Sequence, residues 1–328
     1  MTAKKMNSLQ AVNSALAQAM AEDDKVLVLG EDVADREGGG VTGATAGLST
    51  RFGDDRVKST PISEQAIIGA AIGAALAGYK PVAEIMLMNF TTVAMDMIFN
   101  HAAKLRFMSG GQSTVPITIR TLTGAGWQTA GQHADHLEGW FAHTAGIKVV
   151  APSTPADYKG LLLSCIQDPD PCIFIESAGS LFIPGEVDEV ATPIPLGKAR
   201  IVQEGSDITI VSWSSQLLRC QAALPALAEA GISVELVDLR TVSPWDREAV
   251  LASVAKTGRA LVVHEAVRDF GPGGEIASTI AEELFGQLKA PVRRLGAPKS
   301  PVPFAKVLED AYIVSPERVA ETVKALMA

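Results

Sequence analysis

Two short stretches of this 328-residue chain carry side chains that could move protons. The first is Glu64, which follows Ser59-Thr60-Pro61-Ile62-Ser63 and begins an apolar helical pattern. Ser63 could cap that helix, and the helix dipole stabilises a glutamate in the first turn, so one interpretation is purely structural. The other is a carboxyl group that hydrogen-bonds a heterocyclic nitrogen and exchanges a proton with it.

The second stretch concentrates histidines. Residues 132–143 read Gln-His-Ala-Asp-His-Leu-Glu-Gly-Trp-Phe-Ala-His and hold three of the five histidines in the chain. His133 and His136, with Glu138 or His143, could bind zinc, although their spacing matches no known zinc motif. A polar loop that opens a helix is a second interpretation. A general acid or hydrogen-bond donor at a cofactor is a third, because the pKa of histidine lies near neutrality.

Composition and charge exclude several classes of protein. The formal charge is −9 and no run of Lys and Arg offsets it locally, so we expect no nucleic acid partner. The longest apolar stretch, residues 66–79, is too short to cross the roughly 30 Å of hydrocarbon in a bilayer. The three cysteines have no paired spacing, and the first residues do not form a secretory signal. A reducing cytoplasm is the expected location.

Other phosphate-binding and nucleophile motifs have little support. Residues 38–43 fit the dinucleotide spacing GxGxxG only formally, because the acidic segment 31–37 separates them from the preceding strand pattern. Neither a Walker A loop nor a GxSxG serine elbow occurs in the sequence.

Short β-branched runs alternate with helical patterns, which is typical of βαβ units in a mainly parallel sheet with helices on both faces. The first half predicts strands at 25–29, 81–87, 115–121, 147–151 and 172–176, and helices at 8–20, 65–79, 91–108 and 155–167. After a Gly-, Pro- and acid-rich segment, a second α/β pattern predicts strands at 207–212, 233–238 and 260–264, and helices at 216–230, 246–256 and 274–285. We therefore expect two α/β domains, residues 1–190 and 191–328.

The helix predicted at 65–79 has almost no polar face. Gly69, Gly73 and Ala77 recur every four residues and would form a ridge that a second backbone could approach closely. A contact between subunits and burial against the chain's own sheet explain this pattern equally well.

Ordered motifs along nearly the whole chain resemble the beta subunit of thiamine diphosphate-dependent dehydrogenases of the pyruvate, acetoin and branched-chain 2-oxo acid family. They include Thr60-Pro61-Ile62-Ser63-Glu64, Ser109-Gly110-Gly111-Gln112, Gly146-Ile147-Lys148-Val149-Val150, Val237-Asp238-Leu239-Arg240-Thr241 and His264-Glu265-Ala266. The resemblance implies a pyrimidine-binding domain followed by a transketolase C-terminal-like domain.

The resemblance also implies partners and cofactors. The family forms alpha2-beta2 heterotetramers with thiamine diphosphate at the alpha-beta interface, where alpha holds the diphosphate through Mg²⁺. The family motif for that task, which begins Gly-Asp-Gly and ends in Asn, does not occur in this sequence. Because Mg²⁺ bound to phosphates needs such oxygen ligands, an alpha subunit is required as partner.

Site residues follow from the same resemblance. Glu64 matches the glutamate that bonds the pyrimidine nitrogen of the cofactor, Met86 and Phe90 match residues that pack against that ring, and His133 matches a histidine that assists transfer of the acyl group. A structural potassium site is implied at Ile117, Cys165, Ile166, Asp168 and Asp170. The sequence departs from the family at His133-Ala134-Asp135-His136, where His-Ser-Gln is usual, and at residues 177–180, where many relatives carry Lys or Arg and Tyr.

The implied activity is that of an oxidoreductase. It cleaves the C–C bond beside the carbonyl of a small 2-oxo acid and passes the acyl unit to lipoamide on a lipoylated acyltransferase. Acetoin cleavage is the leading alternative, and a carboligase without a lipoyl partner is a variant. A non-catalytic interaction subunit is the alternative from another class, and the residues above do not separate these activities.

Overall fold

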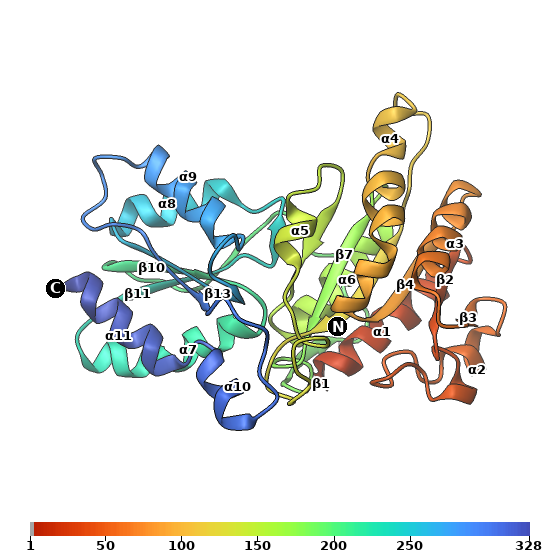
Figure 1. The fold of residues 1–328 in the computed structure, drawn as a ribbon, viewed down its shortest axis with the longest axis horizontal. Coiled ribbons are helices and arrows are strands. Elements are labelled where there is room, and N and C mark those ends of the chain that lie inside the picture. The colour runs from red at the N-terminus through yellow and green to blue at the C-terminus, as the bar shows by residue number, and fades with distance from the viewer. Residues whose placement is uncertain (1–2) are drawn as a thin grey trace.

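Seven strands form the first sheet of the computed structural model, which describes residues 3–328 (Figure 1). In spatial order they are β12 (Thr241–Ser243), β6 (Lys148–Val150), β7 (Cys172–Ser177), β5 (Thr118–Thr123), β4 (Lys80–Leu87), β2 (Val26–Glu31) and β3 (Val57–Thr60). All neighbours pair in parallel except β12, which runs antiparallel to β6. The mainly parallel sheet expected from the alternation of elements is confirmed.

Helices cover both faces of this sheet, as predicted. On one face α1 (Ser8–Glu22) and α6 (Pro155–Gln167) pack on the sheet in one apolar cluster. On the other face α3 (Glu64–Leu76) does so in a second cluster. This half also contains three short helices, η1 (Asp35–Glu37), α2 (Leu48–Phe52) and α5 (Glu138–Ala142). Strands β1 (Ala3–Asn7) and β8 (Pro184–Asp188) form a separate two-stranded antiparallel sheet.

The helix predicted at 91–108 is confirmed only in part, because most of these residues are helical but do not form one regular α-helix. The segment divides into a 3-10 helix η2 (Met88–Ala94), a π-helix η3 (Met97–Ala102) and α4 (Leu105–Met108), which projects from the lobe (Figure 1). The hydroxyls of Thr91 and Thr92 donate hydrogen bonds to the carbonyls of Met88 and Asn89. Such side-chain bonds compete with regular helical bonds, and β-branched residues lose rotamer freedom in a helix.

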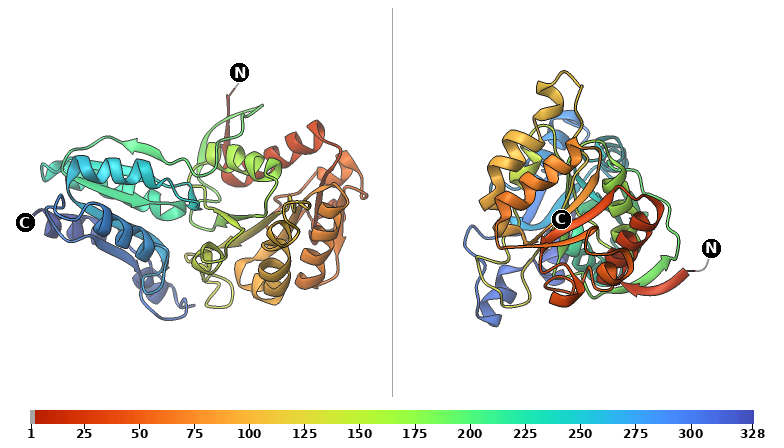
Figure 2. Two further views of the ribbon diagram at one scale, coloured as in Figure 1. Left: turned by 90° about the horizontal axis from the view of Figure 1, so that it is seen from above. Right: turned by 90° about the vertical axis from the view of Figure 1, so that its right-hand side faces the viewer.

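The second lobe contains a five-stranded sheet in the order β14 (Arg293–Ala297), β13 (Ala260–Val267), β10 (Ile208–Ser212), β11 (Val234–Asp238) and β9 (Arg200–Gln203). One face is covered by α7 (Ser214–Glu229) and α11 (Pro316–Met327), the other by α8 (Arg247–Thr257) and α9 (Gly273–Glu283). A further helix, α10 (Lys306–Tyr312), lies beside the first lobe (Figures 1 and 2).

The two lobes share part of their core. One apolar cluster runs from Ile67 and Ile117 in the first lobe to Trp213 and Val262 in the second. Strand β12 comes from the second half of the sequence but extends the first sheet. The division at residues 190 and 191 stays a prediction. In the described part of the chain, residues 3–328, no helix is both long enough and apolar enough for a membrane crossing.

Candidate active site

Parallel strands β2, β3 and β4 end at one edge of the first sheet. In the register of the sheet, Glu31 lies beside Thr60 and Gly30 lies beside Glu84, so the carboxyl ends of these three strands are aligned. The carboxyl ends of parallel strands are the usual place for a ligand in such sheets. This edge therefore brings together Glu31, the start of α3 and Met86.

Glu64 begins α3 at this edge. Ser63 occupies the N-cap position, but its side chain makes no capping hydrogen bond, so the predicted cap does not form. The Glu64 carboxylate is half-buried and makes no hydrogen bond or ion pair to any residue in the described range, 3–328. Burial, followed by the charges of Asp32 and Glu64, raises the pKa of the neighbouring Glu31 carboxyl. A partly buried carboxylate with unused acceptors is suited to bind a donor from outside the chain.

Phe90 and His133 meet beside this edge. The ring centroids lie 5.5 Å apart, and the planes cross at 72°. Asn89 fixes the segment that carries His133: its Nδ2 donates to Oδ2 of Asp135 at 2.9 Å, and its Oδ1 accepts from the Asp135 backbone N–H at 3.1 Å. The His133 ring makes no hydrogen bond within residues 3–328. The structure thus brings two of the predicted site residues into contact and leaves the imidazole nitrogens available.

Met86, at the end of β4, lines a small cavity with Glu84, Arg120 and Glu176. Arg120 lies between the two glutamates: its Nη1 is 2.7 Å from Oε2 of Glu84, and its Nη2 is 2.6 Å from Oε1 of Glu176. Burial lowers the pKa of Arg120, but Glu176 and Glu84 outweigh burial, so the net shift is upward. This buried triad supports the strands under the site.

Sequence reasoning did not find the triad. The available signal was one charged residue inside each of three apolar strand patterns, because an unpaired charge is rarely fully buried.

The glycine loop packs tightly over the triad: a Cβ on Gly40, at φ +81°, would lie 2.8 Å from Oε1 of Glu84. The loop with Gly38, Gly39 and Gly40 therefore packs over a carboxylate and is not built to bind a pyrophosphate.

The three histidines of residues 132–143 lie in different environments. His133 contacts Phe90, His136 is buried beside Glu138 and Glu265, and His143 is exposed at the end of α5. Over residues 3–328, no group of three or more His, Cys, Asp or Glu side chains is arranged to hold a metal ion. The zinc interpretation of this segment therefore has no structural support.

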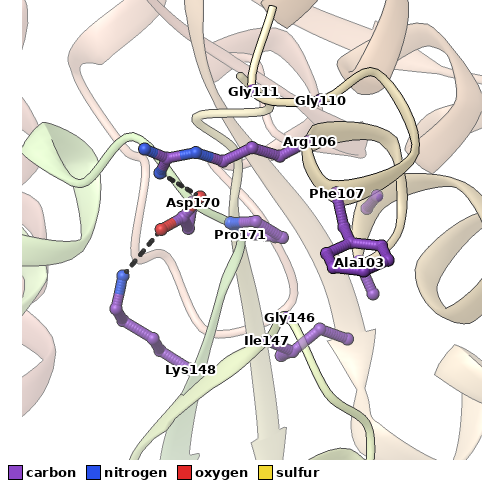
Figure 3. Close-up of a pocket in the computed structure, with 11 residues that line it drawn as sticks. Ala103, Arg106, Phe107, Gly110, Gly111, Gly146, Ile147, Lys148, Asp170 and Pro171 are labelled. Carbon is purple, nitrogen blue, oxygen red and sulfur yellow. Dashed lines mark hydrogen bonds and ion pairs between the residues drawn. The ribbon is translucent and has the colours of Figure 1, made fainter. Parts of the chain in front are cut away.

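The residues expected to bind potassium lie around the end of α6 and the starts of β5 and β7. They are Ile117, Cys165, Ile166, Asp168 and Asp170. Nζ of Lys148 lies 2.5 Å from Oδ1 of Asp168. Lys148, at 3.3 Å from Oδ2, and Arg106 both pair with Asp170 (Figure 3). These cations already neutralise both carboxylates, which leaves carbonyl oxygens as the expected ligands. A potassium ion at this place stays a prediction.

Comparison with known proteins identifies the family. Residues 4–182 match the family model described as transketolase, pyrimidine binding domain, and residues 197–319 match transketolase, C-terminal domain. The subunit beta of acetoin:2,6-dichlorophenolindophenol oxidoreductase from Cupriavidus necator is 44% identical, and the match covers 99% of this chain and 98% of that protein. The chain belongs to the transketolase-like family of thiamine diphosphate-dependent dehydrogenase beta subunits.

Other members of this dehydrogenase beta family are equally similar. The pyruvate dehydrogenase E1 component subunit beta of Acholeplasma laidlawii is 43% identical over 97% of both chains. The mitochondrial 2-oxoisovalerate dehydrogenase subunit beta of Dictyostelium discoideum is 44% identical over 99% of this chain and 87% of its own. A solved structure titled split gene transketolase, inactive beta4 tetramer, has a TM-score of 0.80 at 20% identity and covers 98% of each chain, which establishes the shared fold.

The dehydrogenase beta site fits one end of the family cofactor. The aminopyrimidine of thiamine diphosphate is a flat heterocycle with nitrogens that donate and accept hydrogen bonds. Glu64 has unused acceptors, and Met86 and Phe90 are half-buried apolar side chains at the same sheet edge. We therefore expect these three residues to hold the aminopyrimidine, while the diphosphate end has no matching motif in this chain.

Proposed function

We propose that this chain is the beta subunit of a 2-oxo acid dehydrogenase component that cleaves a small 2-oxo acid of the pyruvate type and acylates lipoamide. The observation that carries the proposal is the unpartnered Glu64 carboxylate at the carboxyl edge of a pyrimidine-binding sheet. A cytoplasmic location is part of the proposal and is supported by three free, buried cysteines.

In this proposal each residue has one task. Glu64 binds a pyrimidine nitrogen and exchanges a proton there, which general acid-base chemistry allows because the carboxylate is positioned by a helix start. Met86 and Phe90 form an apolar wall that orients the ring. His133, which packs on Phe90, donates or accepts a proton near the reacting carbon. The cofactor itself supplies the electron sink for C–C bond cleavage.

The proposal includes an alpha subunit, in an alpha2-beta2 assembly, that holds the diphosphate and Mg²⁺. The exposed face of α3 supports a subunit contact. Ile67 and Ile72 pack inward, whereas Leu76 is 51% exposed, and Ile62, just before the helix, is 77% exposed. Gly73 and Ala77 also lie on the exposed side. Both interpretations of this helix pattern therefore have a basis, because one face is buried in the chain and the other is a small-residue apolar surface.

A substrate panel tests the proposed activity. The purified alpha-beta pair, with thiamine diphosphate and Mg²⁺, should turn over pyruvate or a branched-chain 2-oxo acid with an artificial electron acceptor. In a separate reaction without that acceptor, the oxidised lipoyl disulfide of an acyltransferase domain should accept both the acyl unit and the two electrons. Failure with every 2-oxo acid and with acetoin, in a pair that retains the cofactor, would contradict the proposal.

Acetoin is the second candidate substrate. Two relatives of comparable similarity, from Cupriavidus necator and Bacillus subtilis, are named as acetoin:2,6-dichlorophenolindophenol oxidoreductase beta subunits, at 44% and 42% identity. A higher kcat/KM for acetoin than for pyruvate in the same panel would favour this candidate.

Replacing His133 by Ala should lower acylation of the lipoyl domain by about 100-fold, a typical effect for a positioned acid or base. Cofactor affinity should change little, because His133 packs edge-on against Phe90 and is not itself expected to bind the aminopyrimidine. Single-turnover acylation and cofactor titration would measure the two effects. His143→Ala, at an exposed histidine of the same segment, is the matched control. Equal losses of acylation in both variants would contradict the proposed role of His133.

A further inference from the structure

The segment that carries His133 is held by carboxylates from the second lobe. Glu265, in β13, accepts a hydrogen bond from the Ala125 backbone N–H at 2.9 Å and one from the Ser215 hydroxyl. Glu309, in α10, accepts from the backbone N–H groups of Gly126 at 2.7 Å and Gln128 at 3.1 Å. Both glutamates are at least 94% buried, since their exposed fractions are 6% and 0%.

His136 adds a charged contact at the other end of this segment. Its Nε2 lies 3.2 Å from Oε1 of Glu265, and its Nδ1 lies 3.4 Å from Oε2 of Glu138. The side chains of His136, Glu138 and Glu265 are exposed by only 5%, 1% and 5%. Glu138 and Glu265 are buried on either side of the His136 ring. Their negative charges would repel each other unless the imidazole carried a positive charge.

The charge states agree with this geometry. Burial lowers the pKa of His136, but Glu265 and Glu138 outweigh burial and raise the pKa well above the ordinary value. Burial raises the pKa of Glu265, but His136 and the donated hydrogen bonds outweigh it and bring the pKa to about 2. Burial raises the pKa of Glu138 too, and His136 reverses the shift, so this pKa is also lowered.

The other groups around His136 do not replace its charge. His264, whose ring stacks on Trp213 with centroids 5.4 Å apart, has its pKa lowered to about 4 by burial and is neutral. Burial raises the pKa of Tyr312, which is therefore neutral as well. Asp135, on the same segment, is bound by Asn89. The positive charge between the two glutamates therefore belongs to His136.

We propose that His136 is a positioning residue: as an imidazolium between Glu138 and Glu265, it fastens residues 124–138 to the second lobe and so keeps His133 against Phe90. The effect on turnover rests on the proposed function, whereas the fastening itself does not. His136 lies in the stretch where this chain departs from the usual family sequence.

Replacing His136 by Gln in the alpha-beta pair tests the proposal. The variant removes the cation and keeps a polar side chain, so backbone amides of residues 126–133 should exchange hydrogen faster, because the segment opens more often. A small misplacement of a working group costs about 100-fold in rate, so kcat should fall by about 10- to 100-fold with a smaller change in KM. The double variant His136→Gln/Glu265→Gln should recover part of the protection, because it removes one of the two buried carboxylates that the single variant leaves unpaired.

The pH dependence has a definite sign. A histidine whose pKa is raised on folding contributes stability that is complete below its unfolded pKa, near 6.5, and is lost as the pH rises through the folded pKa. Protection of residues 126–133 should therefore decrease at alkaline pH in the parent pair and show no such step in His136→Gln.

His101→Gln, at a histidine whose side chain is 47% exposed, is the control and should leave exchange and turnover unchanged. Unchanged exchange in His136→Gln would overturn the fastening, whatever happens to turnover. Faster exchange with unchanged kcat would overturn the positioning role. If the parent pair itself turned over no substrate, the proposed function would be contradicted. The hydrogen-exchange result would still test whether His136 fastens residues 124–138 to the second lobe.

Discussion

Glu64→Gln is expected to lower turnover of the reconstituted alpha-beta pair by about 100-fold or more, the range for loss of a positioned acid-base group. Gln has nearly the same shape and still accepts a hydrogen bond, but it cannot take up or release the proton. The Glu64 carboxylate makes no internal hydrogen bond or ion pair in residues 3–328, so little folding energy depends on it. Steady-state turnover, with thermal unfolding as the stability measurement, would test this.

A matched control separates catalysis from helix stabilisation. Glu248 is also a first-turn glutamate, in α8, and is exposed. Glu248→Gln removes the same favourable interaction with a helix dipole, which is about 0.3–1 kcal/mol. It should leave turnover intact. If Glu64→Gln and Glu248→Gln behaved alike, Glu64 would be a structural residue and the chain could be a non-catalytic subunit.

Arg120→Met is expected to lower the free energy of unfolding by about 3–5 kcal/mol, because it leaves two buried carboxylates without a counter-charge. The side chains of Arg120, Glu84 and Glu176 are exposed by only 2%, 7% and 4%. Methionine fills much of the arginine volume, so the loss should reflect charge more than a cavity. Urea unfolding of the chain, followed by circular dichroism, would measure it.

A triple variant identifies the origin of that loss. Arg120→Met combined with Glu84→Gln and Glu176→Gln removes all three charges together. It should recover a substantial part of the stability, because a neutral buried set needs no ion pairing. If the triple variant were as unstable as Arg120→Met, loss of packing would explain the effect and the charge argument would fail.

Local patterns were enough to predict much of this fold. The spacing of apolar residues located α6 at its observed bounds and placed the sheet strands β2, β4, β5, β6 and β7, because side-chain periodicity is a property of a few adjacent residues. The same local reasoning found the helical segment 91–108 but not its change from 3-10 to π geometry. The edge strands β3, β9 and β12 were missed because they are only three or four residues long, and β14 because Arg293 and Arg294 interrupt its apolar pattern.

By itself the sequence determined the fold class, the family and a small set of candidates that includes Glu64 and His133, since these depend on motifs and on short-range order. Only the tertiary structure decided which charges neutralise one another. Arg120 meets glutamates 36 and 56 residues away, and the Ala125 backbone binds Glu265 at a separation of 140 residues. Such contacts depend on where strands are placed in a sheet and on how two lobes pack, and neither is encoded in a local pattern of residue types.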